Sequence, residues 1–198
     1  MTIFSHEYFN SIDFDRRKFA KSGGVFEMCQ LWLNLPKKHK MHAPRYQPIL
    51  SKDIPTVTVS DNGTTARIIA GSLKGENGPA KTFSPVELWD VNIPSKGGDF
   101  ETIVPAGHNF VVFVRKGGII VGDKSLGPQD AAILTPKDLS SKDGNILTFA
   151  ATKDNSSVLV LGGEPIDEPI AARGPFVMNT NDELTEAWQD FYSGKMGR

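Results

Sequence analysis

The chain has 198 residues, with 22 lysines and arginines against 23 aspartates and glutamates. This near balance gives a formal net charge of −1 and disfavours direct binding to nucleic acid, which requires a strongly basic surface. The single cysteine, Cys29, excludes an internal disulfide and a thiolate metal cluster, and it fits a reducing compartment.

The N-terminal segment reads MTIFSHEYFNSIDFD, which is too polar and too acidic for the apolar part of a secretory signal. No apolar run in the sequence approaches the length of a transmembrane helix. We therefore expect a cytoplasmic protein with no membrane partner.

Short β-rich runs bounded by Gly, Pro, Asn or Asp follow one another after the basic loop that ends near residue 47. Turn residues between them tolerate positive φ, as tight antiparallel hairpins need. This pattern predicts an all-β fold closed into a sandwich or barrel. The predicted strands are Val57–Ser60, Ala66–Gly71, Val86–Ile93, Phe100–Val104, Asn109–Arg115, Gly118–Val121, Ala131–Leu134, Ile146–Ala151 and Ser157–Gly162.

The C-terminal tail carries the clearest helix signal. Thr180 and Glu183 have the T-x-x-E spacing of a capping box, and Gly194 is suited to end the helix. One apolar face predicts packing against a sheet, with Trp188 buried against a barrel or near Trp32. The residues of that face are Leu184, Ala187, Trp188 and Phe191.

Three stretches match sequence motifs of a known family: VFEMCQLWLNLPKKHKMHAPRYQ at 25–47, GGEP at 162–165 and GPFVMNT at 174–180. In these residues the chain resembles the pirin family, whose members are iron-binding bicupins. The run 104–134 is similar to the core of a cupin barrel, with GPQD at 127–130 where cupins commonly carry Pro-Gly-Asp.

The resemblance implies an all-β, cupin-type antiparallel barrel (a double-stranded β-helix) with a C-terminal helix and a partial N-terminal cupin remnant. We expect residues 1–46 to form that remnant with the junction strand and loop, 47–163 the C-terminal cupin barrel, and 164–198 the tail with its helix. The family junction stands close to Met1, so we interpret the chain as an N-terminally shortened pirin-like protein, either a short version or a fragment.

A cupin metal site needs several imidazole and carboxylate donors that converge inside the barrel. The chain has four histidines, His6, His39, His42 and His108, and no His-x-His pair. The resemblance implies that the family iron is held in the first barrel by a His-x-His pair and a later His-x-Glu. In that alignment Glu7 keeps the glutamate position, whereas the histidine position falls on Ser5.

His6 and Glu7 are therefore the candidate residual metal ligands, with a solvated N-terminal pair as the alternative. A one-residue shift along a strand turns a side chain to the opposite face, which weakens His6 as an inherited ligand. His39 and His42 lie in a loop between Pro36 and Pro44, where we expect no metal site. We expect His108 to be a turn histidine bonded to backbone groups.

Two functions remain open. The first is a pirin-like cupin protein without the family's metal site, acting as a non-catalytic binding or interaction module with no cofactor. Its partner would be a protein or a second copy, since removing a first barrel would leave apolar surface facing water. The alternative is a metal-dependent, quercetin 2,3-dioxygenase-like enzyme. In that case the family's metal-binding cupin half would be supplied in addition to these residues, and it would hold iron or another divalent metal.

Overall fold

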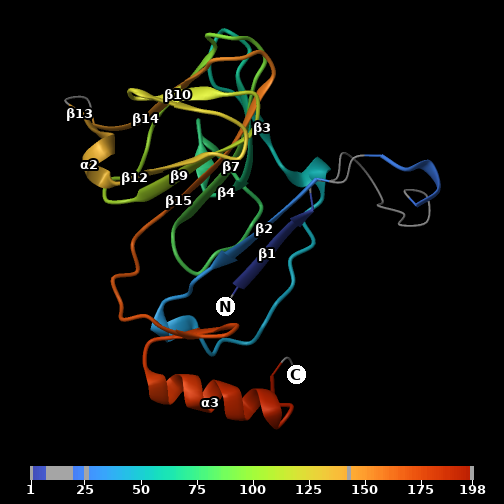
Figure 1. Ribbon diagram of the computed structural model, residues 1–198, viewed down its shortest axis with the longest axis vertical. Coiled ribbons are helices and arrows are strands. Elements are labelled where there is room, and N and C mark those ends of the chain that lie inside the picture. Colours follow the sequence, from blue (N-terminus) through green and yellow to red (C-terminus); the bar gives the residue numbers. More distant parts are fainter. Residues whose placement is uncertain (1, 8–19, 25–26, 142–143, 197–198) are drawn as a thin grey trace. The chain divides into compact units, whose positions relative to one another are not determined.

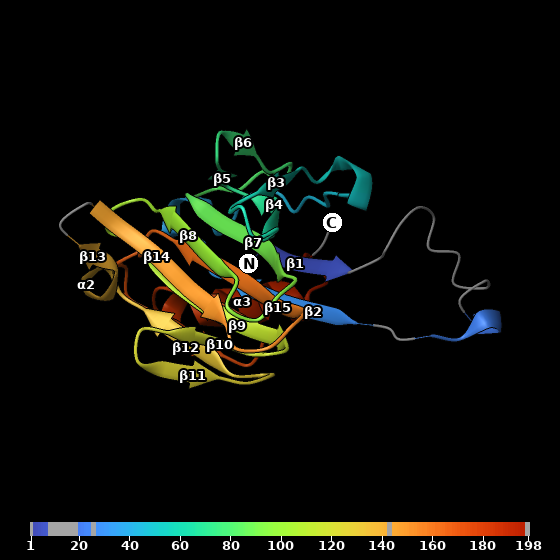
Figure 2. The same cartoon turned by 90° about the horizontal axis from the view of Figure 1, so that it is seen from above.

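The computed structural model describes residues 2–7, 20–24, 27–141 and 144–196, with the side chains of 2–7, 141 and 144 left out. It divides the chain into two compact units, 52–165 and 1–51 together with 166–198 (Figure 1; Figure 2). Among the described residues, no helix is both long and apolar enough to cross a membrane.

The 52–165 unit consists of antiparallel strands in two main sheets. The larger sheet has the order β12-β9-β15-β7-β4-β3, and the smaller has the order β11-β10-β14-β13 with β8 paired to β14. The larger sheet contains β3 Thr56–Thr58, β4 Thr65–Ala70, β7 Val86–Ile93, β9 Asn109–Lys116, β12 Ala131–Leu134 and β15 Ser156–Gly163. The smaller contains β8 Asp99–Ile103, β10 Ile119–Val121, β11 Lys124–Leu126, β13 Ser140–Ser141 and β14 Gly144–Ala151.

Two short additions complete this unit. The hairpin of β5 (Ser72–Leu73) and β6 (Glu76–Asn77) stands between β4 and β7, and the single-turn helix α2 (Pro136–Leu139) stands between β12 and β13. All nine predicted strands are present, with ends that differ by a few residues. The additional strands β5, β6, β11 and β13 have only two or three residues each, too few to show a period-2 pattern.

Alternate residues of the two sheets point into one shared apolar core. Phe100 of β8 stacks on Phe149 of β14, with ring centroids 4.8 Å apart. Trp89 of β7 lies 6.2 Å from Phe100 and 6.1 Å from Phe110 of β9, and all three rings are fully buried. The interior of this barrel is therefore filled by aromatic and branched aliphatic side chains, which supply most of its stability through burial.

The unit formed by 1–51 and 166–198 has less regular structure. Its elements are β1 Thr2–Glu7 paired with β2 Met28–Leu33, the 3-10 turn η1 Lys37–His39, the hairpin of β16 Ala171–Arg173 and β17 Phe176–Met178, and the helix α3 Asn181–Tyr192. A second 3-10 turn, η2 Ser51–Asp53, lies at the boundary between the units.

The predicted capping box of the tail helix is confirmed. The hydroxyl of Thr180 accepts a hydrogen bond from the backbone N–H of Glu183 at 3.2 Å, and the Glu183 carboxylate accepts one from the backbone N–H of Thr180 at 3.0 Å. These reciprocal bonds satisfy two amides that the first helical turn would otherwise leave unpaired.

The apolar face of α3 differs from its prediction at the C-terminal end. Leu184 and Ala187 are buried, whereas Trp188 is half-buried and Phe191 is 53% exposed. The Trp188 ring contacts Phe176 edge-on at 5.0 Å and stacks on Tyr192 at 5.5 Å. Trp188 thus belongs to an aromatic cluster within the tail, and we expect its loss to cost less than the roughly 3–5 kcal/mol typical of a fully buried large aromatic.

Gly162 of β15 gives a direct test of the packed barrel interior. A Cβ atom added at Gly162 would lie 2.3 Å from Cε1 of the fully buried Phe110 ring, whereas one at Gly163 would lie 3.5 Å from the carbonyl oxygen of Pro85. We expect Gly162→Ala to destabilise the protein by about 1–3 kcal/mol through overpacking. Gly163→Ala should change stability by much less. Urea unfolding of both variants measures this, and equal midpoints would contradict the packing described.

Candidate functional site

A buried carboxylate and a buried imidazole meet inside the barrel of the 52–165 unit. Nδ1 of His108 lies 3.1 Å from Oε2 of Glu87, and the two side chains are only 8% and 9% exposed. Glu87 lies two and four residues before the core residues Trp89 and Val91 on β7. Residues at this spacing share one face of a strand, so the side chain of Glu87 faces the interior. His108 stands two residues before the interior residue Phe110, at the entry to β9.

The sheet brings these two residues together across an intervening strand. β15 lies between β7 and β9, and its residue Gly162 pairs with Glu87 on one side and with Phe110 on the other. Because Gly162 carries no side chain, the Phe110 ring lies over its backbone, and no β15 side chain stands between β7 and β9 at that position. Glu87 and His108 can therefore meet above a strand that separates their own strands.

A second glycine, Gly71, accommodates Glu87 directly after the end of the other neighbouring strand, β4. Gly71 has φ +75°, a conformation that favours glycine, and a Cβ atom there would lie 3.1 Å from Cα and from Cγ of Glu87. The pairing of β4 with β7 also shifts register between Ile68 and Ala70. The backbone thus bends closely around the glutamate.

The structure corrects the sequence interpretation of His108. Its ring bonds to the Glu87 carboxylate, not to backbone groups. The sequence does hold one signal for this contact, since VELWDV places a glutamate at an interior position of a core strand. A buried carboxylate needs a hydrogen-bond donor, and the His108 ring supplies one in the tautomer with the proton on Nδ1.

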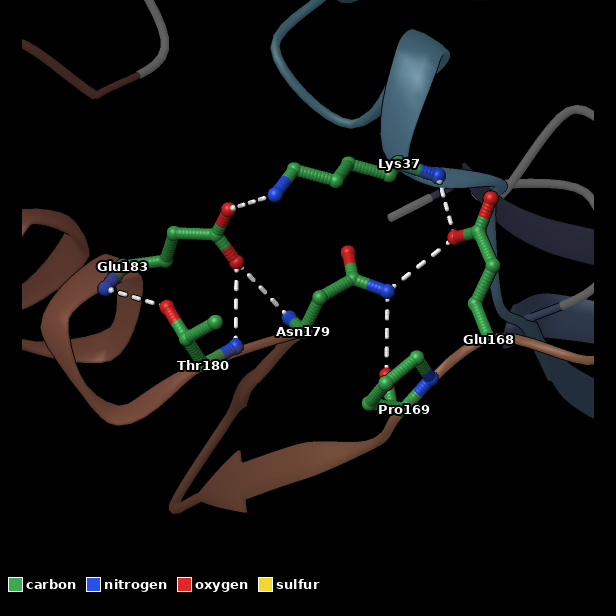
Figure 3. A network of polar contacts seen from close by, with 6 residues as sticks. All are labelled: Lys37, Glu168, Pro169, Asn179, Thr180 and Glu183. Carbon is green, nitrogen blue, oxygen red and sulfur yellow. Dashed lines mark hydrogen bonds and ion pairs between the residues drawn. The ribbon is translucent and has the colours of Figure 1, made fainter.

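A second polar cluster connects the loop after β2 with the tail (Figure 3). The backbone N–H of Lys37 donates to Oε2 of Glu168 at 2.7 Å, and its ammonium lies 3.1 Å from Oε1 of Glu183. The Asn179 amide donates to the same Glu168 oxygen at 3.0 Å and to the carbonyl of Pro169 at 2.9 Å. We call these residues, with Thr180, the loop–tail network.

Lys40 strengthens the same connection. Its ammonium donates to Oδ1 of Asn34 at 2.6 Å and to the carbonyl of Val177 at 3.2 Å. Partial burial lowers the pKa of Lys40, and the carboxylates of Glu168 and Glu183 oppose that shift. The contacts show a structural role for residues within the NLPKKHK segment at 34–40.

Protonation of Glu183 should weaken the loop–tail network. Hydrogen bonds from Lys37 and from the backbone of Asn179 hold the pKa of Glu183 below its usual value of 4.5. A lowered folded-state pKa stabilises the fold above the unfolded-state pKa, and this stabilisation is lost as the pH falls through the folded value. We therefore expect Glu183→Gln to lower stability at neutral pH, with the difference from the parent protein closing under acid.

Glu186→Gln is the matched control, because Glu186 lies on the exposed side of the same helix. Chemical unfolding between neutral pH and about pH 3 follows both variants against the parent. If Glu186→Gln showed the same pH dependence as Glu183→Gln, the network would have no specific role.

Comparison with known proteins identifies the family. The family model described as the pirin C-terminal cupin domain matches residues 88–197, more than half of the chain. This chain belongs to the pirin family. It is 39% identical over 193 residues to a Pseudomonas aeruginosa protein named "Putative quercetin 2,3-dioxygenase", covering 98% of this chain and 63% of that one.

Two further relatives agree. Mouse pirin is 31% identical over 175 residues, which cover 85% of this chain and 56% of the pirin. The crystal structure of quercetin 2,3-dioxygenase from Acinetobacter baumannii superposes with a TM-score of 0.80 at 42% identity, over 91% of this chain and 60% of that one. The chain therefore spans less than two thirds of the length of each of these three proteins.

The described residues do not fit a resident iron centre of the kind that the family implies. They contain no group of three or more His, Cys, Asp or Glu residues placed to hold a metal ion. Glu87 and His108 supply two donors, fewer than the three protein ligands usual in a catalytic metal site. The backbones of His6 and Glu7 lie in β1 opposite Cys29 and Met28, but their side chains lie outside the described part of the chain.

Proposed function

We propose that this pirin-family chain is a non-catalytic binding or interaction module built on a cupin barrel. The observation that carries the proposal is the filled interior of the 52–165 unit. Trp89, Phe100 and Phe110 are fully buried there, and the Phe110 ring lies against the backbone of β15 at Gly162. Small barrels have an interior filled by side chains in this way, whereas larger barrels enclose ligand cavities or channels.

A quercetin 2,3-dioxygenase-like activity is the second candidate. The names of the Pseudomonas and Acinetobacter relatives favour it. Such chemistry would need metal ligands beyond the donors of the described residues. In this alternative, a metal-binding cupin half supplies them, and the present barrel contributes stability to that half.

Quercetin turnover separates these two functions. We expect the purified chain to consume quercetin at the rate of a heat-treated control, with or without added iron, copper or nickel, since the barrel interior is occupied by packed side chains. We also expect elemental analysis to find no stoichiometric iron. A metal-dependent rate well above the control, with about one metal per chain that is lost on His6→Ala, would favour the dioxygenase instead.

The partner proposed for this module is a second copy of the chain or another protein. The exposed side of β2 carries Met28 and Trp32, which are 51% and 55% exposed. In the described residues β2 pairs only with β1, and a two-stranded sheet is marginally stable without a covering element. Exposed apolar side chains on such a sheet support an interface.

Substitution of Trp32 tests the homodimer. We expect the parent protein to be dimeric in light scattering and Trp32→Ser to shift the population toward monomer, because the indole supplies much of the exposed apolar surface of β2. Tyr46→Ser is the control, since Tyr46 is an exposed aromatic residue outside the strand. A monomeric parent protein, or an equal effect of both substitutions, would contradict the proposed interface.

A further inference from the structure

The sequence holds two asparagines that are followed directly by glycine, Asn62 and Asn77. In such a pair the backbone nitrogen of the glycine can attack the amide carbon of the asparagine side chain, because glycine has no side chain to hinder the approach and tolerates the required backbone angles. The reaction converts the asparagine to aspartate or isoaspartate. The two pairs are equivalent as sequence motifs, so the fold decides which of them reacts.

Asn62 is held in place by hydrogen bonds to its own side chain. Its Oδ1 accepts from the hydroxyl of Ser60 at 2.7 Å and from the backbone N–H and the hydroxyl of Thr64 at 3.1 and 2.6 Å. Its Nδ2 donates to the carboxylate of Asp99. Thr64 is fully buried, so these contacts belong to the packed barrel. They must break before the amide of Asn62 can turn toward the nitrogen of Gly63.

Asn77 lacks this protection. It ends β6, both residues of that strand are exposed, and none of the described residues hydrogen-bonds the Asn77 side chain. The restraint on this pair is the hydrogen bond from the backbone N–H of Gly78 to the carbonyl of Gly71, at 2.9 Å. The hairpin has two residues in each strand, and such short exposed pairing opens locally at low cost. Opening of β6 frees the Gly78 nitrogen to react.

We propose that Asn77 is a site of spontaneous modification, at which water replaces the side-chain amide by a carboxylate. In the first step the nitrogen of Gly78 bonds to Cγ of Asn77 and the Cγ–Nδ2 bond breaks. The proton of the Gly78 nitrogen leaves with the amide group as ammonia, and a cyclic imide remains. Water then adds to one of the two imide carbonyls and opens the ring to aspartate or isoaspartate. Water is the co-reactant, and no oxidant or reductant takes part.

The two products differ in their effect on the barrel. Aspartate adds a second carboxylate beside Glu76 on an exposed strand, where solvent and salt screen both charges. Isoaspartate instead adds a methylene carbon to the backbone ahead of Gly78. That backbone lies tightly against Ile69, since a Cβ atom added at Gly78 would be 2.5 Å from the Ile69 carbonyl carbon. The longer backbone therefore displaces Gly78 and breaks its hydrogen bond to Gly71.

Peptide mapping by mass spectrometry, after incubation in mildly alkaline buffer, tests this site. In the folded protein we expect Asn77 to convert at least about tenfold faster than Asn62, because more hydrogen bonds must break to release Asn62. In urea-unfolded protein the two asparagines should convert at similar rates, which would show that the fold causes the difference. Asn77→Gln is the matched control, because it keeps a side-chain amide but places it too far from the Gly78 nitrogen to react readily.

Urea unfolding of the separated products tests the structural consequence. The isoaspartate form should unfold at a lower urea concentration than the parent, whereas Asn77→Asp should unfold at the same concentration as the parent. The proposal is overturned if the folded protein converts Asn62 as fast as Asn77, or if Asn77 stays intact in the folded protein while the unfolded protein converts. An isoaspartate form as stable as the parent would contradict the displacement of Gly78.

Discussion

The barrel interior depends on residue 162 being glycine, which has no side chain beyond hydrogen. This absence lets the Phe110 ring lie against the backbone of β15, and the same residue pairs with Glu87 on the opposite neighbouring strand, β7. Apolar packing and the buried Glu87–His108 pair therefore rest on the same backbone position. A Cβ atom there would displace Phe110, and Phe110 in turn contacts Trp89 at the centre of the core.

The loop–tail network gives a physical reason for the presence of family sequence motifs in two distant parts of the chain. The NLPKKHK segment contributes Asn34, Lys37 and Lys40, and the tail contributes Glu168 and Asn179. Lys37 and Glu168 are 131 residues apart in sequence. Neither segment has enough regular structure to fix its own conformation, so each is held by polar contacts to the other.

Local patterns in the sequence predicted local structure well. The strands follow from apolar runs between turn residues, and the α3 capping box follows from the spacing of Thr180 and Glu183. The Glu87–His108 contact could not be predicted in the same way, because it depends on β15 entering the sheet between β7 and β9. The exposure of Phe191 at the end of an otherwise apolar face also depends on how the tail folds.

Hydrogen exchange in the barrel tests the central claim that its interior is a packed core. In a filled barrel the amides of β7, β9 and β15 become exposed to solvent only through global unfolding. The account predicts that the amides of Trp89, Val112 and Val160 exchange with a free energy equal to that of global unfolding in urea. Exchange of these amides by local opening, at a free energy well below the global value, would show an interior that opens to solvent without global unfolding and would contradict the account.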